Sequence, residues 1–119
     1  MAQTLRVQAY VGNDTDGGGA GNKAFTVTTT GNGSWSQKGS VGTSEEEWTI
    51  GAEVGDAGYC TVRNFDATNY VQVGFATTAY SMRLKAGQSA AFPLEPSQGS
   101  LFLKANTAAC VVQVVVTEA

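Results

Sequence analysis

Short runs of β-branched and aromatic residues, interrupted about every ten residues by turn-forming sequences, are the feature that most restricts the fold of this chain. In residues 5–11, apolar and polar side chains alternate, which gives a strand one buried and one wetter face. No window longer than a few residues spaces apolar side chains at i, i+3, i+4 and i+7, as an amphipathic helix requires. The chain is therefore predicted to fold into strands.

The expected strands are bounded by Gly, Pro, Asn or Asp, which favour chain reversal. Residues 34–44 have a weaker pattern, and an edge strand and an ordered loop are both open there. Ser44 and Glu47 have the spacing of a helix capping box, but Gly51 follows too soon for a useful helix, so a charged edge segment entering a strand is preferred. The remaining strands are expected at 5–11, 23–30, 48–50, 59–65, 70–75, 80–84, 89–94, 101–105 and 109–117.

Turn chemistry gives expectations about how these strands are connected. Residues 31–33 (Gly-Asn-Gly) predict a tight hairpin turn, and residues 66–69 (Asp-Ala-Thr-Asn) predict a hairpin between 59–65 and 70–75. Residues 12–22 contain no core-forming side chain and are expected to be a flexible exposed loop. The valine-rich run at the end is apolar on both faces except at Gln113, which predicts a central strand or one covered on both sides.

Frequent reversals without helical crossovers indicate an all-β chain. The prediction is a single domain over residues 1–119, an antiparallel β-sandwich or jelly-roll-like barrel of about eight to nine strands. A length of 119 residues suits one domain with its own core and is too short for two of ordinary size.

Charge and composition disfavour several classes of function. Charged residues make up 14% of the chain, against roughly 25% in an average soluble protein, and a surface so poor in charge is common where protein meets protein. The formal net charge of −3 provides no basic field for nucleic acid or anionic membrane, and neither partner is expected. The first residues lack the features of a signal peptide, which leads us to expect synthesis and assembly in a cytoplasm.

Residues able to perform catalysis are scarce. The chain contains no His, the commonest general base and a frequent zinc ligand. Glu45, Glu46 and Glu47 are consecutive, so their side chains diverge along a strand. The Asp- and Asn-containing residues 13–18 lack the closing Glu of a calcium loop, which leaves weak cation binding as an alternative to a flexible loop. No enzyme activity, metal or cofactor is therefore expected.

The two cysteines and the aromatic residues each allow more than one interpretation. Cys60 and Cys110 lie in apolar runs and are expected to be buried thiols, with a disulfide formed after release or a reactive thiol as alternatives. Trp35, Trp48 and Tyr80 are the candidate interface residues, because aromatic side chains are enriched where proteins meet. Core packing and a carbohydrate-binding surface are alternatives for the same side chains.

Residues 58–74 (GYCTVRNFDATNYVQVG), 82–88 (MRLKAGQ), 91–94 (AFPL) and 101–109 (LFLKANTAA), followed by the valine-rich strand, resemble a pattern found in small virion proteins of tailed bacteriophages. The resemblance covers roughly the C-terminal half of the chain. It implies a β-sandwich virion structural protein, with a capsid cement or decoration protein as the first choice. Such a protein would be assembled in the host cytoplasm, bind the major capsid protein or neighbouring virion proteins, and form a homo-oligomer, with a trimer as the best guess.

Two other functions stay open at this point. A neck or tail component is compatible with the same residues, and a carbohydrate-binding module for host attachment would use the aromatic side chains instead. The three possibilities share one physical basis, which is that the chain acts by binding its neighbours.

Overall fold

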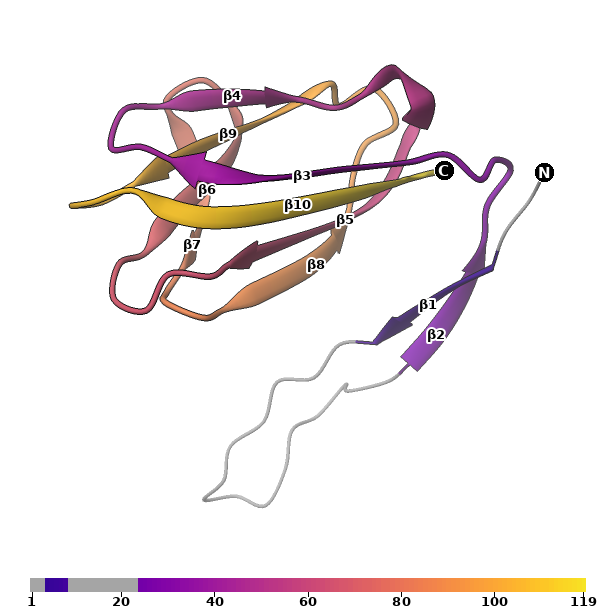
Figure 1. The fold of residues 1–119 in the computed structure, drawn as a ribbon. Coiled ribbons are helices and arrows are strands. Elements are labelled where there is room, and N and C mark those ends of the chain that lie inside the picture. Colours follow the sequence, from indigo (N-terminus) through magenta and orange to yellow (C-terminus); the bar gives the residue numbers. More distant parts are fainter. Residues whose placement is uncertain (1–3, 9–23) are drawn as a thin grey trace, which may run out of the picture. The chain divides into compact units, whose positions relative to one another are not determined.

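The chain folds as an antiparallel β-sandwich, and this confirms the predicted all-β class. The structure, a computed structural model, describes residues 4–8 and 24–119. Two four-stranded sheets form the sandwich, one in the order β3-β10-β5-β8 and the other in the order β4-β9-β6-β7 (Figure 1). The strands are β3 (Ser34–Val41), β4 (Glu46–Thr49), β5 (Ala57–Asn64), β6 (Val71–Ala76), β7 (Ala79–Leu84), β8 (Ser89–Pro93), β9 (Ser100–Ala105) and β10 (Cys110–Glu118), and a short 3-10 helix, η1 (Ala52–Val54), precedes β5.

The order of the strands is that of a jelly roll. Consecutive strands from β3 to β10 alternate between the two sheets, except that β6 and β7 are neighbours in one sheet. This arrangement corresponds to two Greek keys wrapped around one core. Of the two predicted architectures, the sandwich with jelly-roll connections is therefore the one observed.

The core lies between the sheets, and in its central strands it is built from every second residue. Val112, Val114 and Val116 of β10 have no exposed surface, and Leu101 and Leu103 of β9 face them from the opposite sheet with none exposed either. Each such side chain stabilises the fold by about 1.5–3 kcal/mol relative to an exposed position. The period of two that predicted the strands thus also selects the residues of the core.

Two further strands form a hairpin in the N-terminal part. Strand β1 (Thr4–Gln8) pairs antiparallel with β2 (Ala24–Thr28). The chain divides into two compact units, residues 1–32 and residues 33–119, and the second contains the whole sandwich. The predicted flexible loop at 12–22 lies outside the described residues, as does the end of the strand expected at 5–11. Whether the first 32 residues belong to one domain with the sandwich stays a prediction.

Two predicted hairpins are wrong. β2 pairs with β1 and β3 pairs with β10, so residues 31–33 do not join partners in a hairpin. Residues 66–69 reverse the chain as expected, but β5 and β6 belong to different sheets. The physical reason is that Asp and Asn stabilise a reversal through local backbone hydrogen bonds, whichever sheet the next strand enters. The hairpin that does form within the sandwich joins β6 to β7.

Other predictions about single strands are confirmed. Of the edge strand and the ordered loop left open for residues 34–44, the edge strand is observed, as β3. The acidic segment leads into the edge strand β4 instead of a helix, as predicted. Strand β10 is central, between β3 and β5. One face of β10 lies in the core, whereas Val111 on the other face is 42% exposed.

Candidate functional site

The outer surface of the β3-β10-β5-β8 sheet is poor in charge, and we call it the neutral face. Its members are the outward-facing residues, which alternate with the core residues of each strand. Lys38 and Arg63 are the charged side chains among them, and no carboxylate occurs at these positions. The residues of the neutral face are Ser34, Ser36, Lys38 and Ser40 on β3; Val111, Gln113, Val115 and Thr117 on β10; Tyr59, Thr61 and Arg63 on β5; and Ser89, Ala91 and Pro93 on β8.

An exposed apolar pair lies at one end of the neutral face. The backbone N–H of Phe65, just after β5, donates to the carbonyl of Val111 at 2.8 Å, and the two side chains are 36% and 42% exposed. The Nζ of Lys38 lies 4.4 Å from the centroid of the Phe65 ring, and the guanidinium carbon of Arg63 lies 4.5 Å from it. Cations at this distance are attracted to the ring quadrupole, so both charges are held over the apolar pair.

A buried amide fixes the backbone on either side of Phe65. Asn64 has no exposed surface, and its Nδ2 donates to the carbonyls of Asn69 at 2.9 Å and Leu84 at 3.1 Å, with a longer contact to Lys85 at 3.3 Å. Its Oδ1 accepts from the backbone N–H of Asp66 at 2.9 Å. The amide therefore joins the corner between β5 and β6 to the end of β7, and it determines where Phe65 emerges.

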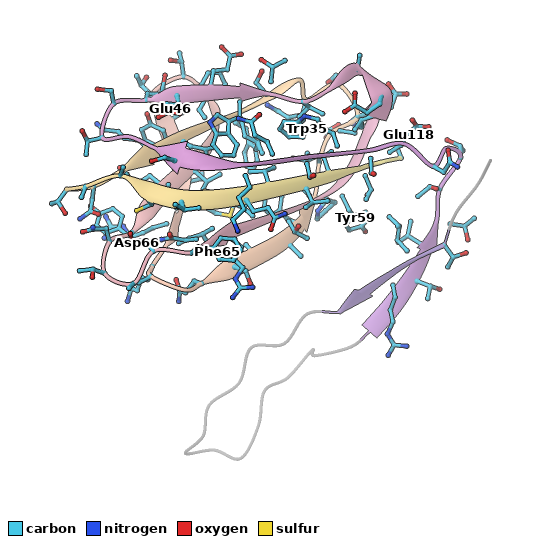
Figure 2. The ribbon with its side chains drawn as sticks, in the orientation of Figure 1. Trp35, Glu46, Tyr59, Phe65, Asp66 and Glu118 are labelled. Atoms are coloured by element: carbon cyan, nitrogen blue, oxygen red, sulfur yellow. The ribbon has the colours of Figure 1, made fainter. Side chains whose placement is uncertain are left out.

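Asp66 holds the next part of the same corner. Its Oδ2 accepts the backbone N–H groups of Asn69 at 2.6 Å and Thr68 at 2.9 Å. These two hydrogen bonds, that from Asn69 first, lower the pKa of the Asp66 carboxyl below its usual value. Figure 2 shows Phe65 and Asp66 at the end of β5 and Tyr59 toward the start of that strand.

On the other sheet, Glu45 ties the start of β4 to the turn between β6 and β7. Its carboxylate accepts from Thr77 Oγ1 and from the backbone N–H of Thr78, each at 2.6 Å, and also from the hydroxyl of Tyr80. The hydrogen bonds from Thr77, Tyr80 and Thr78 lower the pKa of Glu45. Partial burial, together with the neighbouring carboxylate, raises the pKa of Tyr80 to about 12.

The next two acidic residues contact different groups. Glu46 accepts the backbone N–H of Gly42 at 2.6 Å and the indole N–H of Trp48 at 3.3 Å, while the carboxylate of Glu47 accepts from Ser100 Oγ at 2.7 Å. The three consecutive carboxylates therefore do not converge on one point, as the strand geometry predicts. Within residues 4–8 and 24–119, no group of three or more His, Cys, Asp or Glu side chains could hold a metal ion.

The structure places the three candidate interface residues in different environments. Trp48 is 4% exposed and belongs to the core, so core packing accounts for its ring. Trp35 is half-buried and packs against that core, and Tyr80 is half-buried with its hydroxyl on Glu45. The structure does not bring the three side chains together into one surface. The calcium-loop candidate at 13–18 lies outside the described residues.

The cysteines are both buried free thiols, as preferred from the sequence. Burial raises the pKa of Cys60 to about 12 and, with a smaller contribution from Asp66, also raises that of Cys110. Cys60 pairs in register with Val116, which lies six residues along β10 from Cys110. Six residues of a strand span roughly 20 Å, so the two cysteines are at least about that far apart. A disulfide needs Cα atoms within about 7 Å, so the two thiols cannot bridge each other in this fold.

Asn64 and Phe65 were not among the residues singled out from the sequence, although they shape the exposed end of the neutral face. An Asn directly before a Phe-Asp pair, at the end of an alternating run, could have indicated an amide that serves a corner. The alternation itself places Asn64 with the core residues and Phe65 with the outward ones. No local signal, however, reveals the carbonyl of Leu84, which is 20 residues away along the chain.

Comparisons with known proteins define no family for this chain. No protein-family model matches the sequence, and no curated protein matches it either. Among solved structures, the chain is similar to one described as "Bacillus endospore appendages form a novel family of disulfide-linked pili". The match has 13% identity and a TM-score of 0.44 and covers 76% of this chain and 94% of that chain. Within the described residues, no helix could cross a lipid bilayer.

Proposed function

We propose that this chain is a non-enzymatic structural protein of a virion, and that it serves as a capsid cement or decoration protein. The proposal rests on one observation, which is that the polar side chains of the sandwich bind its own backbone. Asn64, Asp66, Glu45 and Glu46 all bind backbone groups of turns or strand ends. They hold a rigid jelly roll in shape, and the sandwich is left to act through its surfaces.

Three further points support the structural role. Jelly rolls are found in viral capsid and lectin domains, although a fold of this kind does not by itself specify a function. The neutral face offers mostly uncharged side chains, which are inexpensive to desolvate against another protein. The resemblance of roughly the C-terminal half of the chain to small virion proteins of tailed bacteriophages agrees with both points. Many modest contacts repeated over a shell would add through avidity.

The carbohydrate-binding alternative gains no support from the aromatic side chains that suggested it. A sugar stacks on an exposed ring face, whereas Trp48 lies in the core and Trp35 packs against it. Replacing either Trp would disturb the core, so loss of glycan binding in such a variant would not identify a sugar site.

The proposal is tested by locating the protein on particles. The purified chain is mixed with expanded tailed-phage capsids that lack it and sedimented, with unexpanded procapsids as the control. Binding to the expanded capsids, with density over the whole shell in electron microscopy, is the expected result. Density confined to one vertex or to the tail would support the neck or tail alternative. Absence from every part of the particle would refute a virion role.

A further inference from the structure

We infer that the neutral face docks onto the acidic edge of a second copy of this chain, so that copies associate head to tail. The acidic edge is the part of the edge strand β4 that carries Glu46 and Glu47. The inference concerns self-association alone and does not depend on the virion proposal.

The apolar part of the neutral face is the first observation. Phe65 and Val111 are the large hydrophobic side chains most exposed within the described residues, and they are neighbours on this face. Scattered single exposed residues need no explanation, but these two are neighbours across β5 and β10 and lie beside uncharged side chains of the same sheet. Together they form an apolar patch at one end of a largely uncharged face, and apolar and aromatic side chains flanked by polar ones are typical of a protein interface.

The second observation is that charged side chains on the two surfaces have no ion-pair partner, and this indicates what the neutral face would bind. Lys38 and Arg63 contact the ring of Phe65 and form no ion pair with a carboxylate among the described residues. Glu46 and Glu47, in turn, accept hydrogen bonds from neutral groups and contact no cation in the same part of the chain. Side chains of opposite charge without an ion-pair partner therefore lie on two separate surfaces, and Glu47 is the exposed member of the acidic edge because Glu46 is half-buried against Gly42 and Trp48.

The positions of these surfaces make the contact intermolecular. The neutral face is the outside of one sheet, and the acidic edge borders the other sheet of the same sandwich. Two neutral faces packed against each other would bring together surfaces that carry Lys38 and Arg63 and no carboxylate, which is unfavourable. A neutral face against the acidic edge of the next copy pairs opposite charges, and this heterologous contact closes into a ring when the rotation permits.

Sedimentation velocity on the full chain tests the inference, over a range of protein concentrations and at about 0.02 M and about 0.5 M salt. We expect concentration-dependent association that weakens at the higher salt. Arg63→Glu and Glu47→Lys should each weaken association about tenfold, and the variant carrying both changes should recover it to within about threefold of the wild type. Val111→Ser should weaken association without changing its dependence on salt.

Lys85→Glu is the matched control, because it makes the same change of charge as Arg63→Glu at an exposed position in the turn between β7 and β8. It should leave association within about twofold of the wild type. Urea unfolding confirms that each variant keeps its fold. A wild-type chain that stays monomeric at both salt concentrations would overturn the inference. So would a double variant that associates no better than either single one.

Discussion

Replacement of Asn64 should unfold the corner between β5 and β6 more severely than any change on the sheet surfaces. In Asn64→Ala, the backbone N–H of Asp66 and the carbonyls of Asn69 and Leu84 lose their amide partner. The carbonyl of Lys85 still accepts from the N–H of Gln88 at 3.0 Å, and that of Asn69 keeps the weak contact from the thiol of Cys110 at 3.7 Å. Each orphaned buried group costs about 1–3 kcal/mol, and water can reach those at the partly buried side of the corner. The expected loss in the free energy of unfolding is about 2–4 kcal/mol.

Asn64→Asp separates hydrogen bonding from packing, because the two side chains have nearly the same shape. The carboxylate would keep the contact to Asp66 N–H but point an anionic oxygen at the carbonyls of Asn69 and Leu84. An acid in this position is stabilised in its protonated form, so its pKa in the folded state should lie above the unfolded value. The destabilisation should therefore grow as the pH rises through that range and shrink as the pH falls.

Urea titration followed by tryptophan fluorescence measures both effects. Thr61→Ala is the control, since Thr61 is exposed on the same strand and its loss should cost less than about 0.5 kcal/mol. For Asn64→Ala the unfolding midpoint should fall by about 1–3 M urea at an unchanged slope. The reasoning is refuted if Asn64→Ala is as stable as Thr61→Ala, or if the destabilisation by Asn64→Asp does not depend on pH.

Three further predictions concern other parts of the sandwich. Gly74→Ala should destabilise the fold by about 3 kcal/mol or more, because a Cβ there would lie within 2.9 Å of Ala79 backbone atoms. Gly99→Ala is the control in urea unfolding and should be tolerated, because a Cβ at residue 99 meets nothing within 4 Å. Cys60 should react with a thiol reagent about a thousandfold more slowly in the native chain than in urea, because burial raises its pKa from 9.0 to about 12. A colorimetric thiol assay that finds equal rates in both conditions would contradict this prediction. The pKa of Glu45 is lowered in the folded chain, so its stabilising contribution should be complete above its unfolded pKa of 4.5 and be lost as the pH falls through the lower folded pKa. Melting curves of Glu45→Gln should therefore depend less on pH in this acidic range than those of the wild type.

The candidate site could be predicted only in part. Tryptophan is common both in cores and at interfaces, so composition could not show that Trp48 packs inside. Alternation marks Phe65 as outward-facing but does not show that its ring stays exposed. The charges of Lys38 and Arg63 were visible in the sequence, but their convergence on one ring depends on β3 and β5 both pairing with β10. Contacts between segments so far apart along the chain have no local signature.

The sequence by itself determined the strands, the reversals, the outward and inward side chains, and the all-β class, because a strand's period of two and the backbone preferences of Gly, Asn and Asp act within a few residues. Tertiary structure alone decided the pairing partners, including the passage of the chain from β5 in one sheet to β6 in the other. It also decided that Asn64 would reach the carbonyl of Leu84. These choices follow from burying the inward faces of two sheets in one core, which is a property of the whole sandwich.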